Sequence, residues 1–423
     1  DMLQTDKVVH KPHIVILGGG FAGMYTYKSL LKNMGARARY TIVSNSNHFL
    51  FTPLLHEVAT GLLEAYHIVE PIRKLIRHDT TKFMSGTVKT INTQEKIVLL
   101  DSCSVIYDYL VIATGARSNF FNIKGADQYA LPLKSLHDAQ IIRDRCIESF
   151  EKALRANTNK ERSAYLSFVV IGGGPTGVEL AAEMADLCYR TFLSYYEGDI
   201  GHEEISITIV SSTPELVPMF AKSIRKASAR VLARKGISIR LESKVVEVNE
   251  DKGTMADGAT ISTKNIFFTT GVTPNVPIFS GFEPPLTKSK RLLVDDTLRL
   301  IGTQNIFAIG DVATTVDELG GEIPMLAQAA VREGRYVGDA ILRLMKNNAI
   351  KKFTFKLKGE LLSLGEWNAA GKIAGISIGG PLAWFVWRTV YLSKFISPIK
   401  RIRIAFDWTI GIFTSRDIAR ITK

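Results

Sequence analysis

The chain has 423 residues, of which 46% are hydrophobic and 22% charged, so it can bury two or three globular domains and is not a disordered chain. Its net charge of +12 suits phosphate ligands or an anionic membrane surface, yet no nucleic-acid module accompanies it. Cys103, Cys146 and Cys188 form no CxxC pair or metal-type cluster, so we expect structural thiols in a reducing compartment and no metal site. The N-terminal residues lack the apolar core of a secretory signal, and no such signal is expected.

An apolar strand followed by a glycine-rich turn is the first strong signal along the chain. Residues 13–17 are predicted to form the strand, which leads into Gly18-Gly-Gly20-Phe21-Ala22-Gly23. In such a Gly-x-Gly-x-x-Gly turn the first glycine makes the turn, the second admits a pyrophosphate, and the third lets helix pack on strand. A helix from about Ala22 to Met34 should follow, with its positive end toward the phosphates.

The following segments extend this first unit. Residues 40–43 are predicted to form its second strand, which ends at Ser44 and Asn45. Residues 108–115 read as another buried strand, which ends in a small polar turn containing Thr114 and Gly115. Parallel strands buried on both faces have this continuous apolar character.

The same arrangement occurs a second time, after a polar, helix-prone bridge at residues 136–156. Residues 167–171 are predicted to form a strand that leads into Gly172-Gly-Gly174-Pro175-Thr176-Gly177. One such turn is weak evidence, but two, each preceded by a β-branched strand, are strong evidence for two dinucleotide sites. The second unit continues through residues 205–210, 238–249 and 266–271.

The later segments return to the first unit. Residues 305–311 are predicted to form one more strand, ending at Gly310 and Asp311, and a helix is expected from about Met325 to Met345. The sequence therefore predicts an α/β fold with two Rossmann-like dinucleotide-binding domains, the second inserted in the first, and a C-terminal helical segment. The expected domain bounds are 10–125 with 285–348, 126–284, and 349–423.

These residues resemble the two-dinucleotide-binding flavoprotein superfamily that includes disulfide reductases. Its marks are the paired glycine turns, Ala113-Thr114-Gly115, the Thr270-Gly271 turn with Pro274 behind it, and Ile309-Gly310-Asp311. Within the superfamily, the chain resembles the type II NADH:quinone oxidoreductases over nearly all of its length. The most specific segments are 51–61, 174–183 and 327–334.

The resemblance implies which residues bind each cofactor. FAD would lie on the first glycine turn, NAD(P)H would lie on the second, and a quinone would accept the electrons. The residues implied on the FAD side are Gly18, Gly20, Phe21, Ala22, Gly23, Ser44, Asn45, Pro53, Leu54, Thr114, Gly115, Gly310 and Asp311. The others in the cofactor-binding set are Gly172, Gly174, Pro175, Thr176, Gly177, Ser211, Gly271, and, near the quinone, Ala327 and Gln328.

Several polar side chains have both a catalytic and a structural interpretation. Glu179 would orient the nicotinamide or handle protons, or it is simply stabilised by the dipole of its helix. Gln328 would hydrogen-bond a quinone carbonyl, or it is ordinary helix-forming sequence. Asp311 would contact the FAD ribityl–phosphate arm, or it caps a turn. His48 and His56 are candidates for a proton route, although a structural role is favoured for each.

The nicotinamide site lacks a residue that usually fixes its specificity. A Rossmann unit commonly ends its second strand with an acid that binds the ribose hydroxyls, and the corresponding residue here is Ser211. An acid repels the additional phosphate of NADPH, so its loss removes the usual discrimination. We therefore expect NADPH to be used appreciably beside NADH.

The C-terminal region contains two apolar, aromatic stretches, at residues 381–396 and 402–413. Neither has the length of uninterrupted apolar sequence that a spanning helix needs, and Trp384, Trp387 and Trp408 favour the lipid head-group region. We expect monotopic binding to an anionic lipid surface; the alternatives are a dimer interface or helices packed on the core. The basic residues that support lipid binding are Arg388, Lys394, Lys400, Arg401, Arg403, Arg416, Arg420 and Lys423.

Together these features predict a flavoprotein that passes two electrons from NADH, and also NADPH, through FAD to a membrane quinone without pumping protons. It is expected as a homodimer on the cytoplasmic face of a cell membrane, or on a face of the mitochondrial inner membrane. A sulfide:quinone oxidoreductase is the nearest alternative, but the cysteines lack the contexts that carry sulfur. A nicotinamide-binding sensor or assembly protein without turnover is the other alternative, and the intact glycine turns argue against it.

Overall fold

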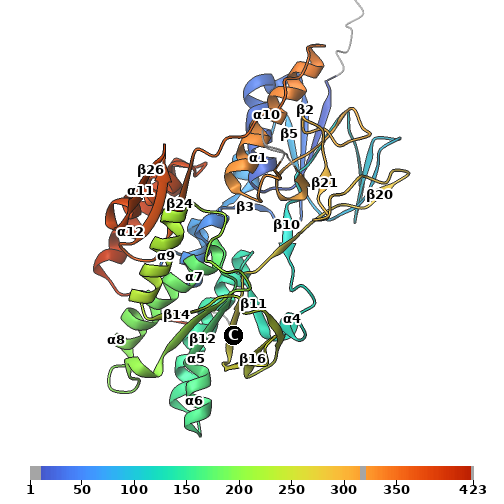
Figure 1. Ribbon diagram of the computed structural model, residues 1–423. Helices are drawn as coiled ribbons and strands as arrows, with labels where there is room; N and C mark the ends of the chain where they lie inside the picture. Colours follow the sequence, from blue (N-terminus) through green and yellow to red (C-terminus); the bar gives the residue numbers. More distant parts are fainter. Residues whose placement is uncertain (1–10, 315–320, 421–423) are drawn as a thin grey trace, which may run out of the picture. The chain divides into compact units, whose positions relative to one another are not determined.

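The computed structural model describes residues 11–314 and 321–420, which form two compact units (Figure 1). Unit 1 comprises residues 1–50, 70–117 and 273–356, and unit 2 comprises 51–69, 118–272 and 357–423. The long middle segment of unit 2 is thus inserted between two segments of unit 1, as the sequence predicts. Residues 1–10, to which the signal-peptide expectation refers, and Lys423 lie outside the described part of the chain.

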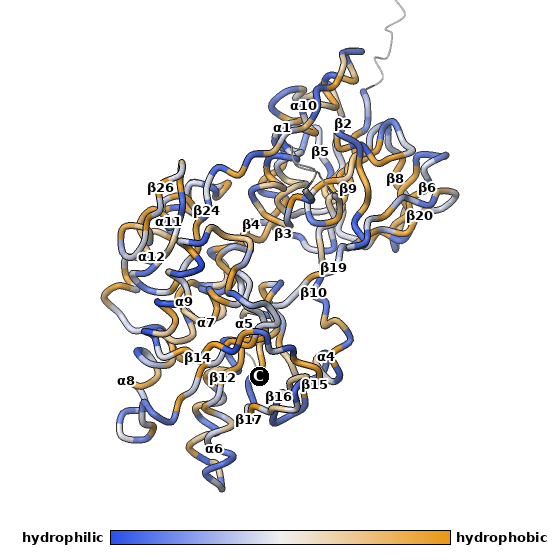
Figure 2. Tube along the Cα trace, in the orientation of Figure 1, coloured by the Kyte–Doolittle hydropathy of each residue, from blue (hydrophilic) through white to orange (hydrophobic). Residues whose placement is uncertain are grey.

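Unit 1 is built on a five-stranded parallel sheet with the strand order β22-β9-β1-β2-β5. The apolar residues of the central strand are fully buried, which explains the run of β-branched residues there. β9 appears as a hydrophobic stretch in Figure 2. The bounds are β1 His13–Leu17, β2 Arg39–Ser44, β5 Thr81–Ser85, β9 Tyr109–Ile112 and β22 Ile306–Ala308.

Two long helices and a small antiparallel sheet complete unit 1. Helices α1 (Phe21–Met34) and α10 (Ala327–Met345) pack against each other, and glycines make the close approach possible. A Cβ on Gly334 of α10 would lie 2.5 Å from the carbonyl oxygen of Ala22 in α1. The antiparallel sheet has the order β20-β6-β7-β8, with bounds Phe279–Ser280, Val88–Asn92, Ile97–Leu100 and Ser104–Ile106.

Unit 2 repeats the parallel architecture with the strand order β11-β18-β12-β13-β14. As in unit 1, the strand before the glycine turn pairs on one side with the next strand of the βαβ unit and on the other with a later strand. The segment 238–249 divides between two sheets, because Glu242 adopts a left-handed turn conformation within it. The bounds are β11 Ala130–Pro132, β12 Ser167–Ile171, β13 Ser206–Val210, β14 Ile237–Arg240 and β18 Asn265–Phe268.

The helices of unit 2 begin at recognisable signals. α5 (Leu136–Leu154) starts at a capping box formed by Ser135 and Asp138, and α7 (Pro175–Asp186) starts with proline in its first turn. A six-residue π-helix (Leu187–Phe192) continues α7. Further elements of unit 2 before residue 357 include α2 Leu55–Ala59, α4 Ala126–Tyr129, α6 Asn159–Tyr165, α8 Leu193–Tyr195, α9 Lys222–Arg234, β15 Val245–Val248, β16 Lys252–Met255 and β17 Thr260–Ser262.

The C-terminal part of unit 2 begins with a sheet for which no prediction was made from the sequence. Residues 359–379 form a three-stranded antiparallel sheet, with β24 at Gly359–Ser363, β25 at Ala369–Ile373 and β26 at Ile376–Gly379. The expected helices follow as α11 (Gly380–Ser393) and α12 (Pro398–Phe413). Among the described helices, none is long and apolar enough to cross a membrane.

Candidate functional site

The first glycine turn leaves room for a ligand at its second glycine alone. Gly18 has φ +117°, and a Cβ there would lie 2.1 Å from the Ala113 carbonyl oxygen. A Cβ on Gly23 would lie 2.0 Å from the Gly18 carbonyl oxygen, whereas a Cβ on Gly20 would meet nothing within 4 Å. The fixed first and third glycines and the open second one fit the pyrophosphate of a dinucleotide at the start of α1.

Most of the residues predicted to bind FAD meet at the same edge of the unit 1 sheet. Ser44 ends β2, and its hydroxyl would lie 3.3 Å from a Cβ placed on Gly19. Thr114 follows β9, and its hydroxyl donates to the Asn275 carbonyl oxygen at 2.7 Å. Gly310 lies close to Ala22 of α1, because a Cβ on Gly310 would be 3.1 Å from the Ala22 side chain. Pro53 and Leu54, by contrast, belong to unit 2.

A carboxylate that the sequence did not single out holds the Gly310 turn. The Gly310 N–H donates to Glu333 of α10 at 2.5 Å, and Glu333 is almost fully buried. Asp311, the predicted FAD contact, lies in the same short 3-10 turn. Ala327 and Gln328 form the first turn of α10, which starts within two residues of the expected position. The quinone contact predicted for Gln328 stays a prediction.

The second glycine turn has the same geometry as the first. Gly172 has φ +127°, and a Cβ on Gly177 would lie 2.0 Å from the Gly172 carbonyl oxygen. A Cβ on Gly174 would meet nothing within 4 Å, and Gly174 is the N-cap of α7. Pro175 and Thr176 form the first turn of that helix, so their backbone carries its positive end. This turn fits a second dinucleotide.

Ser211 lies where a Rossmann unit usually has its ribose-binding acid. It follows β13, is buried, and its Oγ would be 2.7 Å from a Cβ placed on Gly173 of the glycine turn. Its hydroxyl also hydrogen-bonds the hydroxyl of Thr213 at 2.8 Å. Gly271 follows β18, and a Cβ placed on Gly271 would collide with the Phe121 ring at 2.2 Å.

Glu179 is the fifth residue of α7, and its side chain is only 13% exposed. The Ser363 N–H donates to its Oε1 at 3.1 Å, and His56 Nδ1 lies 3.8 Å from its Oε2. Burial raises the pKa of Glu179 to about 8; the Ser363 hydrogen bond opposes this, and the charges of Glu57 and Glu183 add to it. The carboxyl can therefore hold or release a proton near neutral pH.

Two neighbouring side chains of α2 were not predicted as a pair. His56 is buried, and burial, reinforced by the positive charge of Arg416, lowers its pKa to about 3, so the imidazole is neutral. Its Nε2 has no hydrogen-bond partner among the described residues. Burial raises the pKa of Glu57 to about 7 against the opposing charge of Arg388, and Trp408 Nε1 donates to its Oε2 at 2.7 Å.

Aromatic side chains of the C-terminal helices surround this acidic cluster. The Arg388 guanidinium lies between two indoles, 3.7 Å from the ring centroid of Trp384 and 4.7 Å from that of Trp408. Trp387 stacks on Tyr391 with centroids 4.6 Å apart. Burial and the charge of Glu179 raise the pKa of Tyr391, so this phenol stays protonated. The residues around Glu179 and Glu57 thus come from α2, α7, α11 and α12.

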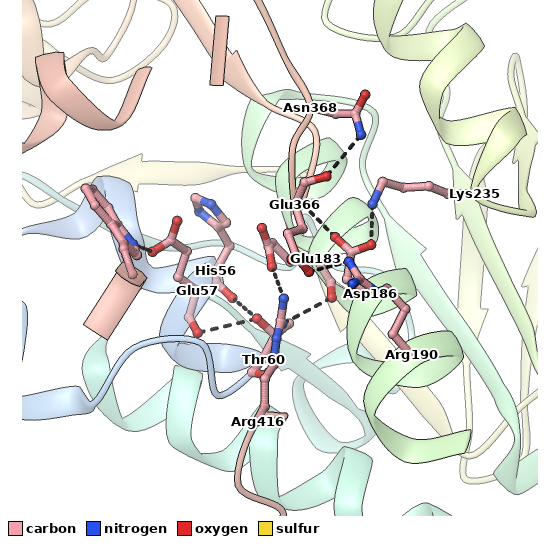
Figure 3. A network of polar contacts seen from close by, with 11 residues as sticks. His56, Glu57, Thr60, Glu183, Asp186, Arg190, Lys235, Glu366, Asn368 and Arg416 are labelled. Carbon is pink, nitrogen blue, oxygen red and sulfur yellow. Dashed lines mark hydrogen bonds and ion pairs between the residues drawn. The ribbon is translucent and has the colours of Figure 1, made fainter. Parts of the chain in front are cut away.

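A second set of charged side chains meets at the end of α7 and beyond it, as Figure 3 shows. Lys235 pairs with Asp186, whose other oxygen accepts the Glu366 N–H at 2.7 Å. Gly365 has φ +85°, and a Cβ there would lie 2.3 Å from the Asp186 carboxylate, so a side chain would disrupt the contact. Arg190 pairs with Glu366 at 2.5 Å. These contacts fix the loop between β24 and β25 on α7.

The cysteines do not form a redox centre in the described part of the chain. Cys103 is exposed in unit 1, and Cys146 and Cys188 are buried in unit 2; all three are free. Burial raises the pKa of Cys146 to about 12 and that of Cys188 well above its ordinary value, which makes both thiols poor nucleophiles. The structural role expected for the cysteines fits the buried Cys146 and Cys188, whereas the exposed Cys103 departs from it.

Comparisons with known proteins identify the family. The model of the pyridine nucleotide-disulphide oxidoreductase family matches residues 12–334, and that of the NDH2 C-terminal domain matches residues 357–417. A Dictyostelium discoideum protein described as a probable NADH dehydrogenase is 32% identical over 98% of this chain and 92% of its own length. The chain belongs to the type II NADH:quinone oxidoreductases of that family.

Further relatives agree with this membership. A type II NADH:quinone oxidoreductase of Mycobacterium tuberculosis is 27% identical over 97% of this chain and 90% of its own length. The solved structure of NDH2 from Plasmodium falciparum in complex with NADH is 24% identical, covers 97% of this chain and 100% of its own, and has a TM-score of 0.89. At that identity the likeness concerns the fold, which is the fold expected for a type II NADH:quinone oxidoreductase.

Glu179→Gln is expected to gain stability relative to the wild type as the pH rises. The folded-state pKa of Glu179 is about 8 and the unfolded-state value is 4.5, so the folded chain binds more protons between these values and its free energy of unfolding falls as pH increases. Glutamine cannot lose a proton. Chemical denaturation between about pH 5 and about pH 9 should therefore show a growing difference between the variant and the wild type.

The exposed Glu197 supplies a matched control. Glu197→Gln should follow the wild type at every pH. A constant difference between Glu179→Gln and the wild type would show that Glu179 is not protonated in the folded chain near neutral pH.

Proposed function

We propose that this chain oxidises NADH and reduces a membrane quinone, with FAD bound in unit 1 and the nicotinamide dinucleotide in unit 2. The observation that carries the proposal is the duplicated glycine turn, fixed at its first and third glycines and open at its second, in a member of the type II NADH:quinone oxidoreductases. FAD, when bound, supplies the step that links a hydride donor to a quinone acceptor. No element of the proposal requires proton pumping.

The side chains of the chain position the substrates and manage protons in this proposal. The backbone N–H groups at Gly20 and Gly174 would hold the two pyrophosphates, and Ser44 and Asn45 would bind the FAD ribose. Glu179, in α7, would orient the nicotinamide and hold a proton, as its pKa of about 8 allows. Gln328 would donate its amide hydrogens to a quinone carbonyl.

The activity is tested with purified protein and a soluble quinone. NADH should drive quinone reduction, and sulfide, added as an alternative donor, should not. Reduction driven by sulfide, or the absence of any NADH-driven reduction in protein that contains FAD, would contradict the proposal.

NADPH is proposed as a second electron donor. Support comes from Ser211, whose hydroxyl rather than a carboxylate lies against the glycine turn of unit 2. An acid at this place would repel the 2′-phosphate of NADPH and bind the free 2′-hydroxyl of NADH. The hydroxyl groups of Ser211 and Thr213 neither repel this phosphate nor bind the hydroxyl as strongly as a carboxylate, so NADPH should be used appreciably beside NADH.

Ser211→Asp is expected to lower kcat/KM for NADPH by at least about tenfold while changing kcat/KM for NADH by less than about threefold, because the new carboxylate repels the 2′-phosphate alone. Steady-state kinetics with both donors measure this. Ser206→Asp, at the exposed opposite end of β13, is the matched control and should change neither value. A wild-type preference for NADH above about a thousandfold would contradict the use of NADPH.

Attachment to an anionic lipid surface is proposed through α11 and α12. The exposed apolar residues of α12 follow a helical spacing, with Ile402 70%, Phe406 63% and Phe413 82% exposed. Lys400, Arg401 and Arg403 lie beside them. An apolar stripe flanked by basic residues binds lipid by burying the stripe and attracting the anionic head groups. The remaining exposed apolar residues of these helices are Leu382, Phe385, Ile399 and Ile410.

The variant Ile402→Glu with Phe406→Glu is expected to bind anionic vesicles at least about tenfold more weakly than the wild type, because two apolar side chains no longer leave water. Cosedimentation at low and high salt measures the binding. Ile278→Glu, which replaces an exposed apolar residue of unit 1, is the matched control. Complete release of the wild type at high salt would contradict apolar insertion. The homodimer and the membrane face remain predictions.

A further inference from the structure

The segment after α12, residues 414–420, places a charged side chain in the interior of unit 2. The Arg416 side chain is 7% exposed and that of Glu183, its ion-pair partner in α7, is 2% exposed. Removing two charges from water is costly, and such pairs persist only where their hydrogen-bonding capacity is well satisfied. The sequence assigns Arg416 and Arg388 to a lipid-facing set and the three tryptophans of α11 and α12 to the head-group region. All five side chains are buried, which corrects these assignments.

The Arg416 guanidinium ties two helices together, as Figure 3 shows. Nη2 donates to Glu183 Oε2 at 2.6 Å. Nη1 donates to the Thr60 carbonyl oxygen at 3.2 Å and to the Glu183 carbonyl oxygen at 3.4 Å. Thr60 is the C-cap of α2, and its own hydroxyl donates to the His56 carbonyl oxygen at 2.9 Å. One side chain therefore connects the end of α2 with the middle of α7.

The backbone around Arg416 is held as well. Arg143 of α5 donates to the Asp417 carbonyl oxygen at 3.0 Å. Arg420 lies 3.4 Å from Glu148, also in α5. The 414–420 segment is thus fixed to α5 on one side and to α2 and α7 on the other, so Arg416 cannot turn outward without breaking these contacts.

The two helices that Arg416 connects carry the two side chains that face each other at 3.8 Å, His56 and Glu179. Glu179 lies one helical turn before Glu183, so a shift of Glu183 moves Glu179 with it. The same ion pair contributes to the electrostatic environment of these two side chains. Arg416 disfavours protonation of His56, and the Glu183 carboxylate raises the pKa of Glu179.

We propose that Arg416 and Glu183 act together as positioning residues for Glu179. They hold its carboxyl group at a fixed separation from His56 and keep the charged groups around it in place. The inference rests on the proposed function, in which Glu179 manages a proton near the nicotinamide. It goes beyond that function by assigning the control of Glu179 to a buried ion pair between α7 and the end of the chain. The titratable and charged groups that act on Glu179 and its neighbours here are His56, Glu57, Glu183, Arg388, Tyr391 and Arg416.

The first test removes the ion pair without leaving an unpaired buried charge. In Arg416→Gln with Glu183→Gln, the Glu183 charge that raises the pKa of Glu179 is absent, so Glu179 should lose its proton at a measurably lower pH than in the wild type. Infrared difference spectra, each taken against the matching Glu179→Gln protein, follow the protonated carboxyl band directly and need no turnover. The pH profile of kcat with NADH and quinone should shift in the same direction.

The second test separates position from charge. Arg416→Lys retains the charge, but its single ammonium group cannot reach both Glu183 and the Thr60 carbonyl. The titration of Glu179 should stay within about 0.3 pH units of the wild type, while kcat falls at least about threefold because the His56–Glu179 separation is no longer fixed. This variant also decides the question if the double variant does not fold. Arg230→Lys, the same substitution at an exposed arginine of α9, is the matched control and should behave as the wild type.

Failure of this inference and failure of the proposed function give different results. A double variant with the wild-type titration and pH profile, or an Arg416→Lys variant with wild-type kcat, would overturn the inference and leave only a structural role for Arg416. A wild-type protein that does not reduce quinone would overturn the proposed function instead. In that case the infrared titration still shows whether the ion pair sets the protonation of Glu179.

Discussion

The close approach of a helix to the strand before it, made possible by glycine, is the constraint on which both units depend. In each unit a Cβ on the third glycine of the turn would lie 2.0 Å from the carbonyl oxygen of the first. Any side chain at Gly23 or Gly177 would therefore push α1 or α7 away from its sheet. Because the helix starts there, its N-terminal N–H groups converge on one point beside the carboxyl ends of the parallel strands. The positions of Ser44 and Ser211 follow from the same geometry.

Unit 2 adds a second constraint, because it buries several charged side chains. Arg388, Arg416 and Glu183 lie in the interior, and each has a partner that offsets part of the cost of leaving water. A set of apolar residues of similar volume would often be at least as stable. The buried charges gather on the face of α7 that also carries Glu179. This coincidence favours a role in setting proton affinity over a role in stability alone.

The sequence predicts those parts of the fold that local patterns determine. The strands 13–17 and 167–171 and both glycine turns are at the predicted positions, because an apolar run and a glycine spacing are visible within a few residues. The surroundings of Glu179 could not be predicted in this way. Glu57 meets Trp408 across 351 residues, and Arg416 meets Glu183 across 233, and no local pattern indicates such pairs.

The assignment of residues 51–69 illustrates the same limit. They lie between strands of unit 1 in the sequence, yet they belong to unit 2, because α2 packs on α5 and α7. The three-stranded sheet at residues 359–379 was missed for a different reason. Its strands are short and interrupted by Gly365 and Gly375 turns, so neither a helical nor a strand period extends far enough to be recognised.

The packing of the indoles has a spectroscopic consequence. All four tryptophans of the chain lie after residue 357. Trp367 stacks on Trp384, Trp387 lies against Trp408, and the Arg388 guanidinium joins the two pairs. Intrinsic tryptophan emission therefore reports on the C-terminal part of unit 2 alone, and unfolding of the unit 1 sheet would be silent to it. If emission and far-ultraviolet circular dichroism change at different denaturant concentrations, the chain does not unfold in one step. The chain thus carries a built-in fluorescent reporter for the docking of its last two helices.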